Sequence, residues 1–553
     1  MTKQILIICL LAFSKVVVSQ SQQSFASQTK DLPQEKIYVH SNNNFLLTGE
    51  TLYYTIYCLN NNNYSPFSKI AYTELIDSKN NSILKQRISL DVGKGYGDFF
   101  ISPQIKTGSY KLVAYTQWMK NKNSFFQQDI FLVNPFSDKL RSNPTNETTT
   151  TLKYNENTNE RNGLFDNLKA SYSKRENVVL NLTNTFSQLK GSFSVSIRKK
   201  NNFQLPNNKT TNTPIKTNNA FYLPELRGTL IQGKVTTSNT SNAITDVKLS
   251  LSTKNKNRLP ITAITNDKGE FYFNIPELRT SKVEIQILDK NANDYNIELI
   301  KPSNENIQFE SFPELFLNED ISKEIRDRSI YSQIENAFYK VKKDSISHTT
   351  KKSPLLNYVQ TTYILDDYKR FKTIKETFVE VIEGAGFIRN KGQYNLSVTN
   401  TGEAKTLKHI PSLLIIDGSI VFNHNDLTDF DSRKIHSISI VKSKYFYGNA
   451  LYQGVVIIRT FKNDFLSSTN KTQEFEVTPV QPQKIYFFQN NKNIKNKRIP
   501  DFRTQLYWNP AINLSQNTLS FFTSDVTGTF EITIQGYTKE GRFINAKERF
   551  SVK

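Results

Sequence analysis

Cysteine is almost absent from this 553-residue sequence, which contains two, Cys9 and Cys58. Cys9 lies in an N-terminal segment with the features of a secretory leader, so we expect one cysteine in the exported chain. One cysteine excludes an intramolecular disulfide, and the domains must then be stabilised by packing alone. Cys58 ends the strand-like run LYYTIYC, where a buried, unreactive thiol is the simplest interpretation and a reactive thiol the alternative.

Long apolar runs are missing beyond the N-terminus. The first segment, MTKQILIICLLAFSKVVVSQ, places Lys3 before an apolar stretch and predicts a signal peptide over residues 1–19, cleaved after Ser19. Cys9 lies too early for a lipoprotein signal, so lipidation is not expected. No later stretch approaches the roughly 18–20 apolar residues of a membrane helix. We therefore expect an exported chain that is soluble or held peripherally at a membrane.

Long runs of one charge sign are also missing, although the net charge is +21. The lysines are scattered among asparagines, as in NNKNIKNK, without an RNP motif, zinc-finger spacing or a helix-turn-helix. Nucleic acid is therefore not expected as a partner. An anionic membrane surface or an acidic protein partner fits the charge better.

Motifs for catalysis and metal binding are missing as well. The sequence contains no HExxH, GxSxG, Walker A or Cys–His arrangement. The best candidate metal cluster is His424 with Asp426, Asp429 and Asp431, but such residues are ordinary in a polar loop. We expect no enzymatic activity, no catalytic residue, no cofactor and no bound metal.

The sequence is rich in short, alternating β-strand patterns. Residues 36–137 hold seven such runs, among them KIYVH, TLYYTIYCL and SYKLVAYTQW, separated by turn clusters such as NNNNYSP. Seven short strands in about 100 residues predict a β-sandwich. The order of these runs resembles the macroglobulin-type domain that begins many exported Bacteroidota proteins. Macroglobulin protease traps use a Cys-Gly-Glu-Gln thioester sequence, which is absent, so the resemblance does not imply a trap.

Two later segments resemble parts of further macroglobulin-type domains. A polar, turn-rich linker is predicted over 138–162, and residues 163–222 look like the first half of a second sandwich, too short to close alone. Residues 475–553, with the segment DFRTQLYWNP, resemble a closing macroglobulin-like β domain. One hypothesis is that 475–553 supplies the strands that 163–222 lacks; otherwise the two segments form separate units.

Residues 223–310 resemble a carboxypeptidase-regulatory, transthyretin-like domain, which implies a small β-sandwich. The resemblance rests on the run GKV followed by TNDKGEFYFNIP. Asp267-Lys268-Gly269 has the composition of a hairpin turn rather than of a ligand or catalytic site.

Two helices are predicted after this domain. The first lies in a helical segment over 311–350, with Asn318 as a plausible N-cap and a stripe of apolar residues at helical spacing. The second spans the run DDYKRFKTIKETFVEVIEG, with Phe371 and Ile382 on one stripe and Gly384 as a C-cap. Each stripe is expected to pack against a sheet.

Residues 353–466 resemble the plug domain of TonB-dependent outer-membrane receptors. The resemblance rests on the run LLIIDG, the strand SISIV and the final strand GVVIIRT, in a β-α-β order. A receptor barrel would need roughly 22 strands of about 9–11 residues. Residues 461–553 are too few for that barrel, so the plug-like segment is interpreted as an α+β domain used outside a pore.

The sequence as a whole predicts a mainly β protein. We expect tandem Ig-like or macroglobulin-type sandwiches, a transthyretin-like sandwich and one α+β plug-like domain. Within the last, the loop SKYFYGNALYQG crowds four aromatic residues that are candidates for partner binding, unless they cap their own domain's core: Tyr445, Phe446, Tyr447 and Tyr452.

These expectations lead to two hypotheses about function. The first is a non-enzymatic, exported accessory or scaffold subunit at the outer membrane, on its periplasmic or cell-surface side. It would dock to a transport, secretion or barrel-assembly complex, with a β-barrel protein as the expected partner. The second is a surface carbohydrate- or peptide-binding module that feeds a TonB-dependent transporter.

Overall fold

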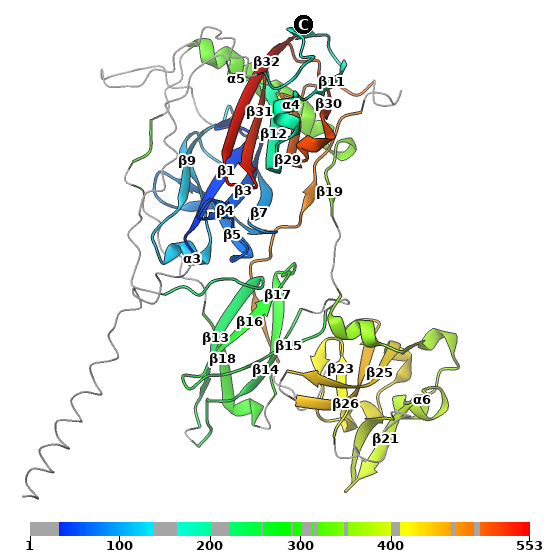
Figure 1. Cartoon of the computed structure of the whole chain (residues 1–553). Helices are drawn as coiled ribbons and strands as arrows, with labels where there is room; N and C mark the ends of the chain where they lie inside the picture. The colour runs from blue at the N-terminus through cyan, green and yellow to red at the C-terminus, as the bar shows by residue number, and fades with distance from the viewer. Residues whose placement is uncertain are drawn as a thin grey trace, which may run out of the picture.

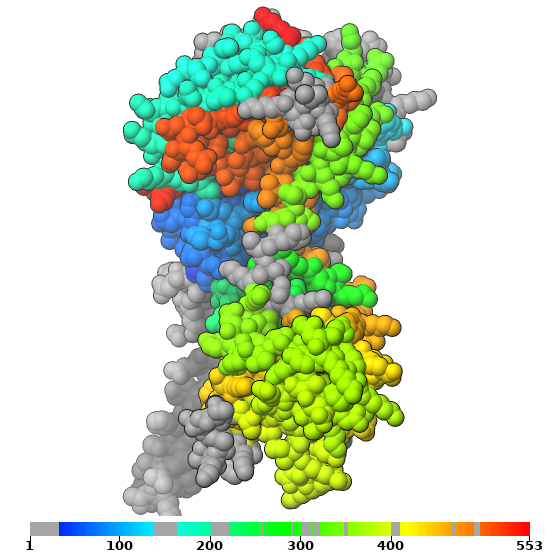
Figure 2. Space-filling model, turned by 90° about the vertical axis from the view of Figure 1, so that its right-hand side faces the viewer, coloured from blue at the N-terminus to red at the C-terminus, as the bar shows by residue number. Residues whose placement is uncertain are grey.

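The computed structural model is mainly β and arranges the chain in an upper and a lower part (Figure 1). The upper part holds two sandwiches and the longest helix, and the lower part holds a third sandwich and an α+β domain, which the sequence resemblances predict as transthyretin-like and plug-like (Figures 1 and 2). The structure describes residues 33–136, 163–201, 221–239, 241–253, 255, 258–288, 291–300, 309, 311–314, 319–347, 352–399, 410–448, 450–465, 472–490 and 498–553. The predicted signal peptide, the linker 138–162 and the N-cap Asn318 lie outside the described residues. None of the described helices is long and apolar enough to cross a membrane.

The first sandwich contains the seven predicted runs as strands and two short additional strands. One sheet consists of β1 (Glu35–Ser41), β3 (Thr51–Asn60), β4 (Asn63–Tyr64) and β7 (Lys94–Phe100). The other runs in the order β2 (Phe45–Leu47), β9 (Phe126–Val133), β8 (Gly108–Tyr115), β5 (Ile70–Asp77) and β6 (Ser82–Ser89), and helix α3 (Gln117–Lys120) lies between β8 and β9 in the sequence. Strand β3 is buried on both faces, because one face packs into its own core and the other faces the second sandwich.

The second sandwich is built from two segments that lie more than 300 residues apart in the sequence. Its main sheet has the order β10 (Ser171–Tyr172), β32 (Phe543–Val552), β31 (Gly528–Thr538), β12 (Gly191–Lys199) and β29 (Gln505–Ile512). Its other sheet pairs β11 (Asn177–Asn181) with β30 (Thr518–Phe522). The C-terminal strands therefore complete the half-sandwich, and the described residues 163–201 and 498–553 form one sandwich rather than two separate domains.

The transthyretin-like sandwich also includes a strand from later in the chain, β27 (Thr472–Glu476). One sheet has the order β16 (Glu270–Ile275), β13 (Thr229–Thr237) and β18 (Tyr295–Leu299). The other has the order β15 (Ile261–Ile264), β14 (Lys248–Ser252), β17 (Lys282–Ile287) and β27 (Thr472–Glu476). Asp267-Lys268-Gly269 does form the tight turn between β15 and β16, with Gly269 at φ +75°.

The plug-like domain is a mixed sheet with a hairpin and two short helices. The sheet has the order β20 (Thr361–Ile364), β25 (Ile435–Tyr447), β26 (Ala450–Thr460), β23 (Leu413–Ile416) and β24 (Ser419–Ile420). The hairpin pairs β21 (Ala385–Asn390) with β22 (Gln393–Val398), and the helices are α6 (Ile374–Glu380) and α7 (Asn425–Thr428). Asp417 and Gly418 have φ of +49° and +85°, as a two-residue hairpin turn requires.

Helix α6 is shorter than the sequence predicts. Thr373 adopts an extended backbone and accepts a hydrogen bond from the backbone of Glu376, whose side chain in turn accepts from the N-cap backbone. This capping box starts the helix at Ile374, and the preceding predicted turns are a short 3-10 segment and extended chain. The helix ends at Glu380, so Gly384 is not its C-cap.

Short helical turns occur elsewhere in the loops. They are α4 (Asn184–Ser187), η1 (Ala292–Asp294), η2 (Tyr339–Val341), η3 (Pro354–Tyr358), η4 (Leu365–Asp367), η5 (Ser432–Lys434) and η6 (Leu514–Gln516).

The chain passes between the upper and lower parts repeatedly. After helix α5 (Glu319–Ala337), strand β19 (Ser345–Ile346) precedes the plug-like domain, and it pairs antiparallel with β28 (Lys484–Ile485) on the return. Between β27 and β28, Val480 is buried in the core of the first sandwich. The returning segment therefore ties the transthyretin-like domain to the upper part.

Candidate functional site

The four aromatic residues predicted as a partner-binding group lie on the hairpin of β25 and β26, where Tyr445 pairs with Tyr452. Tyr445, Tyr447 and Tyr452 pack against a buried apolar cluster that includes Leu259 of the transthyretin-like domain and Leu413 of the plug-like domain. The Tyr447 hydroxyl donates a hydrogen bond to the backbone oxygen of Pro260. Three of the four rings therefore line the junction of two domains.

Phe446 differs from its neighbours because its side chain faces solvent. It is 73% exposed, and Tyr358, which contacts Tyr445 at a ring-centroid distance of 6.3 Å, is 56% exposed. Of the four predicted residues, three tyrosines therefore pack at the domain junction, and Phe446 alone faces solvent.

The other sequence candidates have structural roles. His424 accepts a hydrogen bond at Nδ1 from the backbone of Leu396 at 2.8 Å, and burial lowers the pKa of its imidazole to about 4. Within the described ranges, no three His, Cys, Asp or Glu side chains are placed to hold a metal ion. Cys58 is buried in the first sandwich, and burial raises the pKa of its thiol.

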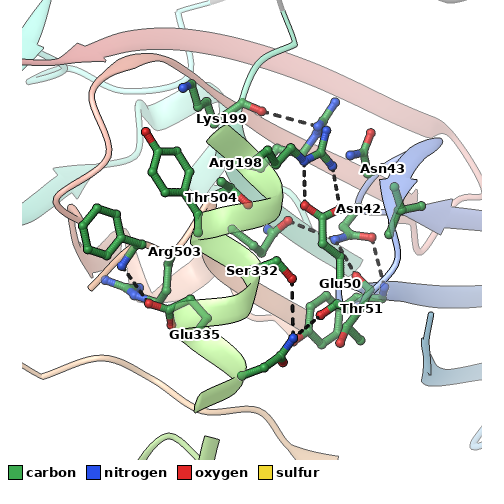
Figure 3. Close-up of a pocket in the computed structure, with 18 of the residues that line it drawn as sticks. Asn42, Asn43, Glu50, Thr51, Arg198, Lys199, Ser332, Glu335, Arg503 and Thr504 are labelled. Carbon is green, nitrogen blue, oxygen red and sulfur yellow. Dashed lines mark hydrogen bonds and ion pairs between the residues drawn. The ribbon is translucent and has the colours of Figure 1, made fainter. Parts of the chain in front are cut away.

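A large cleft lies between the two sandwiches and helix α5 (Figure 3). Its volume is about 1520 Å³. The first sandwich, the end of β12, helix α5 and the segments before and within β29 all contribute lining residues. No motif in the sequence predicts this cleft.

Helix α5 braces the cleft by contacting both sandwiches. Its polar residues occur all around the helix, as expected for a helix that bridges domains rather than one that covers a sheet. At one end, Ile321 and Ile325 pack into an apolar cluster with Phe45 and Val133 of the first sandwich. The apolar stripe predicted for this helix does not pack against one sheet along its whole length. Tyr331 instead stacks on Phe502 of the second sandwich, with the ring centroids 5.3 Å apart.

A buried ion pair fixes the helix to the first sandwich. The Arg328 guanidinium donates to both carboxylate oxygens of Glu50, at 2.6 and 2.8 Å, and both side chains are nearly buried. Arg328 also donates to the side chain of Asn201 at 3.0 Å and to the backbone oxygen of Phe45 at 2.9 Å. Such a two-pronged geometry holds the helix in one orientation.

A second polar network fixes the other end of the helix to the second sandwich. Glu335 accepts a hydrogen bond from the backbone of Phe502 at 2.7 Å and pairs with Lys342 at 2.7 Å. Asp501 pairs with Arg503 at 2.6 Å and lies 3.9 Å from Lys342. The two networks lie on opposite sides of helix α5 in the close-up (Figure 3).

Trp508 of β29 forms part of the cleft wall. Its ring contacts those of His40 and Tyr53 of the first sandwich, at centroid distances of 5.2 and 5.9 Å. Trp508 is only 7% exposed, yet its Nε1 has no hydrogen-bond partner in the described structure. The Oγ1 of Thr48, which also lines the cleft, has none either.

Arg198, at the end of β12, is a half-buried cation in the same cleft. Burial, together with the nearby Arg328, lowers the pKa of its guanidinium to about 10. Within the described structure, no carboxylate lies at ion-pair distance from it, and it donates a long hydrogen bond of 3.4 Å to the backbone oxygen of Lys199. The cleft therefore combines an unpaired cation with unused hydrogen-bonding groups.

Comparison with known proteins adds structural matches of low similarity. No protein-family model and no curated protein matches the sequence. Alpha-2-macroglobulin from E. coli, in its native conformation, matches 94% of this chain and 22% of its own at 7% identity and a TM-score of 0.17. Salmonella alpha-2-macroglobulin reacted with methylamine matches 94% of this chain and 39% of its own at 7% identity and a TM-score of 0.22.

A tetra-tandem repeat from the extending region of a large adhesion protein also matches, over 94% of this chain and 99% of its own, at 8% identity and a TM-score of 0.13. The chain spans less than half the length of the two macroglobulins. Scores this low carry no argument about function, and the fold described above rests on the strand pairings of the chain itself.

Proposed function

We propose that the protein is a non-enzymatic, exported scaffold that docks onto an outer-membrane transport, secretion or barrel-assembly complex. The observation that carries this proposal is Phe446, a large aromatic side chain left 73% exposed at the tip of a hairpin whose other rings are packed. Exposed aromatic residues of this kind are typical anchors in protein interfaces. The plug-like resemblance of the same domain suggests a β-barrel protein as the partner.

The contacts between domains support a scaffold rather than a flexible string of modules. The rings of Tyr445, Tyr447 and Tyr452 join the plug-like domain to the transthyretin-like domain, and β27 and Val480 join that domain to the upper part. Because several buried contacts link the modules, Phe446 is presented at a fixed position relative to the sandwiches. A fixed presentation lowers the entropy lost on docking.

Affinity purification from detergent-solubilised envelopes tests this proposal. The tagged protein is expected to recover a membrane protein complex, and Phe446→Ser is expected to reduce the recovery about tenfold, as for loss of an aromatic anchor. Phe422→Ser is the matched control, since Phe422 is also exposed in the plug-like domain. Recovery of the protein alone, or equal recovery by both variants, would contradict docking through Phe446.

A second candidate function, the capture of a peptide or carbohydrate for a TonB-dependent transporter, is favoured by the cleft. The observation that carries it is the unpaired Trp508 Nε1 on the same sheet face as Arg198, a cation without an ion-pair partner in the described structure. Saturable binding to a peptide or glycan array by the purified protein would support capture, and no binding to either array would argue against it.

A further inference from the structure

We propose that the cleft binds an acidic peptide, whose carboxylate pairs with Arg198 and one of whose backbone carbonyls accepts a hydrogen bond from Trp508. This inference rests on ligand capture, the second function proposed above, and names its ligand class. It does not depend on docking at Phe446.

The charge of Arg198 favours a ligand that carries a carboxylate. The carboxylates that stabilise its charged form are Glu531, Glu50 and Glu324. Glu531 is paired with Arg549 at 3.0 Å and with Lys547 at 3.5 Å, and Glu50 is paired with Arg328. Since two of these three carboxylates are committed elsewhere, Arg198 keeps its donors available, and a carboxylate from a ligand would compensate a cation that burial penalises.

The hydrogen-bonding groups without partners in the cleft favour a ligand with a peptide backbone. A buried indole N–H without a partner costs roughly 1–3 kcal/mol of desolvation, so such groups are rare unless something binds them. Trp508 Nε1 is a donor and Thr48 Oγ1 is both donor and acceptor, and both line the cleft. A peptide backbone, which carries a carbonyl and an N–H at every residue, can satisfy both.

The register of the second sandwich places the two anchors on one sheet face. Trp508 lies opposite Ser196 on neighbouring strands, and Gln505 lies opposite Arg198. The Gln505 side chain donates to Ser196 at 3.0 Å, so these side chains project from the same face. Arg198 and Ser196 are two residues apart on β12, and an extended peptide that rises about 3.3 Å per residue can span this separation.

The shape of the cleft favours a peptide over a sugar. Sugars stack on open aromatic faces, but Trp508 is only 7% exposed and contacts the rings of His40 and Tyr53. The volume of about 1520 Å³ exceeds the roughly 300–1,000 Å³ of small-molecule sites and suits several residues. Phe100 and Phe136, which are 50% and 58% exposed and also line the cleft, offer contacts for apolar side chains of the peptide.

Tryptophan fluorescence tests the inference directly, because the chain contains two tryptophans. Trp118→Phe leaves Trp508 as the reporter. The probe is a pool of amidated octapeptides that alternate glutamate with leucine or phenylalanine, and the matched pool carries glutamine in place of glutamate. We expect a saturable change in Trp508 emission with the acidic pool, and binding at least about tenfold weaker with the glutamine pool.

Two charge variants separate the site from the general basicity of the chain. Arg198→Gln is expected to weaken binding of the acidic pool about tenfold or more. Arg326→Gln removes an equal charge from an exposed position of α5 that does not line the cleft, and it is expected to change binding less than twofold. Circular dichroism and the unfolding midpoint verify that both variants are folded.

Several outcomes would overturn the inference. Equal binding of the acidic and glutamine pools by the otherwise unmodified protein would exclude a carboxylate requirement, whatever the variants do. Equal effects of Arg198→Gln and Arg326→Gln would assign binding to net charge. Free glutamate binding as tightly as the peptides would indicate a small carboxylate ligand instead. Because purified protein is used, none of these results bears on docking to a membrane complex.

Discussion

His40 is a buried histidine at the contact between the two sandwiches. Its Nδ1 lies 2.5 Å from Ser194 Oγ, and the Tyr57 hydroxyl donates to the same oxygen at 2.9 Å. Ser194 therefore has its own hydrogen to donate to Nδ1, which suits the neutral imidazole. Burial, with a smaller contribution from Lys547, lowers the pKa of His40 to about 3.

The depressed pKa of His40 makes the sandwich contact sensitive to acid. The unfolded chain takes up this proton below about pH 6.5 and the folded chain below about pH 3, so the contribution of His40 to stability is lost as pH falls through that window. We expect roughly 2 kcal/mol less stability at pH 5 than at pH 7 from this residue. Denaturant unfolding of His40→Gln at both pH values, compared with the unmodified protein, measures it. Equal pH dependence in the two proteins would contradict the assignment.

Glu225 titrates in the opposite sense. It is buried in the segment before β13, where its backbone oxygen accepts a hydrogen bond from Lys69 of the first sandwich, and its carboxylate accepts a hydrogen bond from the backbone of Leu230 at 3.1 Å. Burial outweighs the opposing effect of Arg87 and raises the pKa of the carboxyl to about 7. The folded state therefore holds a proton that the unfolded chain releases above about pH 4.5.

The raised pKa of Glu225 predicts a stability contribution that is present below about pH 4.5 and lost as pH rises through 7. Between pH 5 and pH 8 we expect a loss of about 2 kcal/mol that Glu225→Gln abolishes. The contributions of His40 and Glu225 have opposite slopes, so the unmodified protein masks both. Difference curves for each single variant, recorded by denaturant unfolding across this range, separate them, and a flat difference curve for Glu225→Gln would contradict the prediction.

At the scale of elements, α5 is held by the Arg328–Glu50 pair rather than by a long apolar stripe. Breaking a buried pair by removing one partner leaves an uncompensated charge and typically costs about 3–5 kcal/mol, whereas removing both costs much less. We expect Arg328→Met to lower the free energy of unfolding by about 3 kcal/mol and Arg328→Met with Glu50→Gln to recover most of that loss. A double variant as unstable as the sum of the single variants would show that the pair does not act as a unit.

Elements with strong local signals could be predicted from the sequence, whereas those set by tertiary contacts could not. The seven runs of the first sandwich and the Asp417–Gly418 turn follow from alternation and turn chemistry. The start of α6 depends on the capping box of Thr373 and Glu376, a local signal in the sequence that outweighs the apolar stripe extending before it. The role of α5 has no local signal, because its polar residues acquire their partners only when two distant segments meet.

The residues that line the cleft also depend on tertiary contacts and could not be predicted from local patterns in the sequence. Asn42 donates a hydrogen bond to Gln505 across 463 positions of sequence, and Arg328 meets Glu50 across 278. No motif connects residues so far apart, so the lining residues do not stand out in the sequence. The aromatic loop did stand out, but its local pattern cannot distinguish rings that seal a domain junction from Phe446, which faces solvent.

At the scale of the whole molecule, the chain closes its second sandwich only after it has built the other domains. Strand β12, from the first segment, lies between β29 and β31 of the last segment, and the core mixes residues of both, for example Val195 with Ile532. The last segment alone thus lacks the strand that joins its own strands into one sheet. A sheet interrupted at its centre exposes two unpaired strand edges and half of its core.

Residues 498–553 expressed alone are therefore expected to remain unfolded, and addition of a peptide spanning 163–201 is expected to restore a cooperative transition. Circular dichroism and backbone NMR dispersion check both parts. A peptide with Val195→Asp serves as the control, because a buried charge in the central strand should prevent complementation. Cooperative unfolding of 498–553 without the peptide would show that the C-terminal strands form a domain of their own, and the two-segment sandwich would then reflect docking of finished units rather than shared folding.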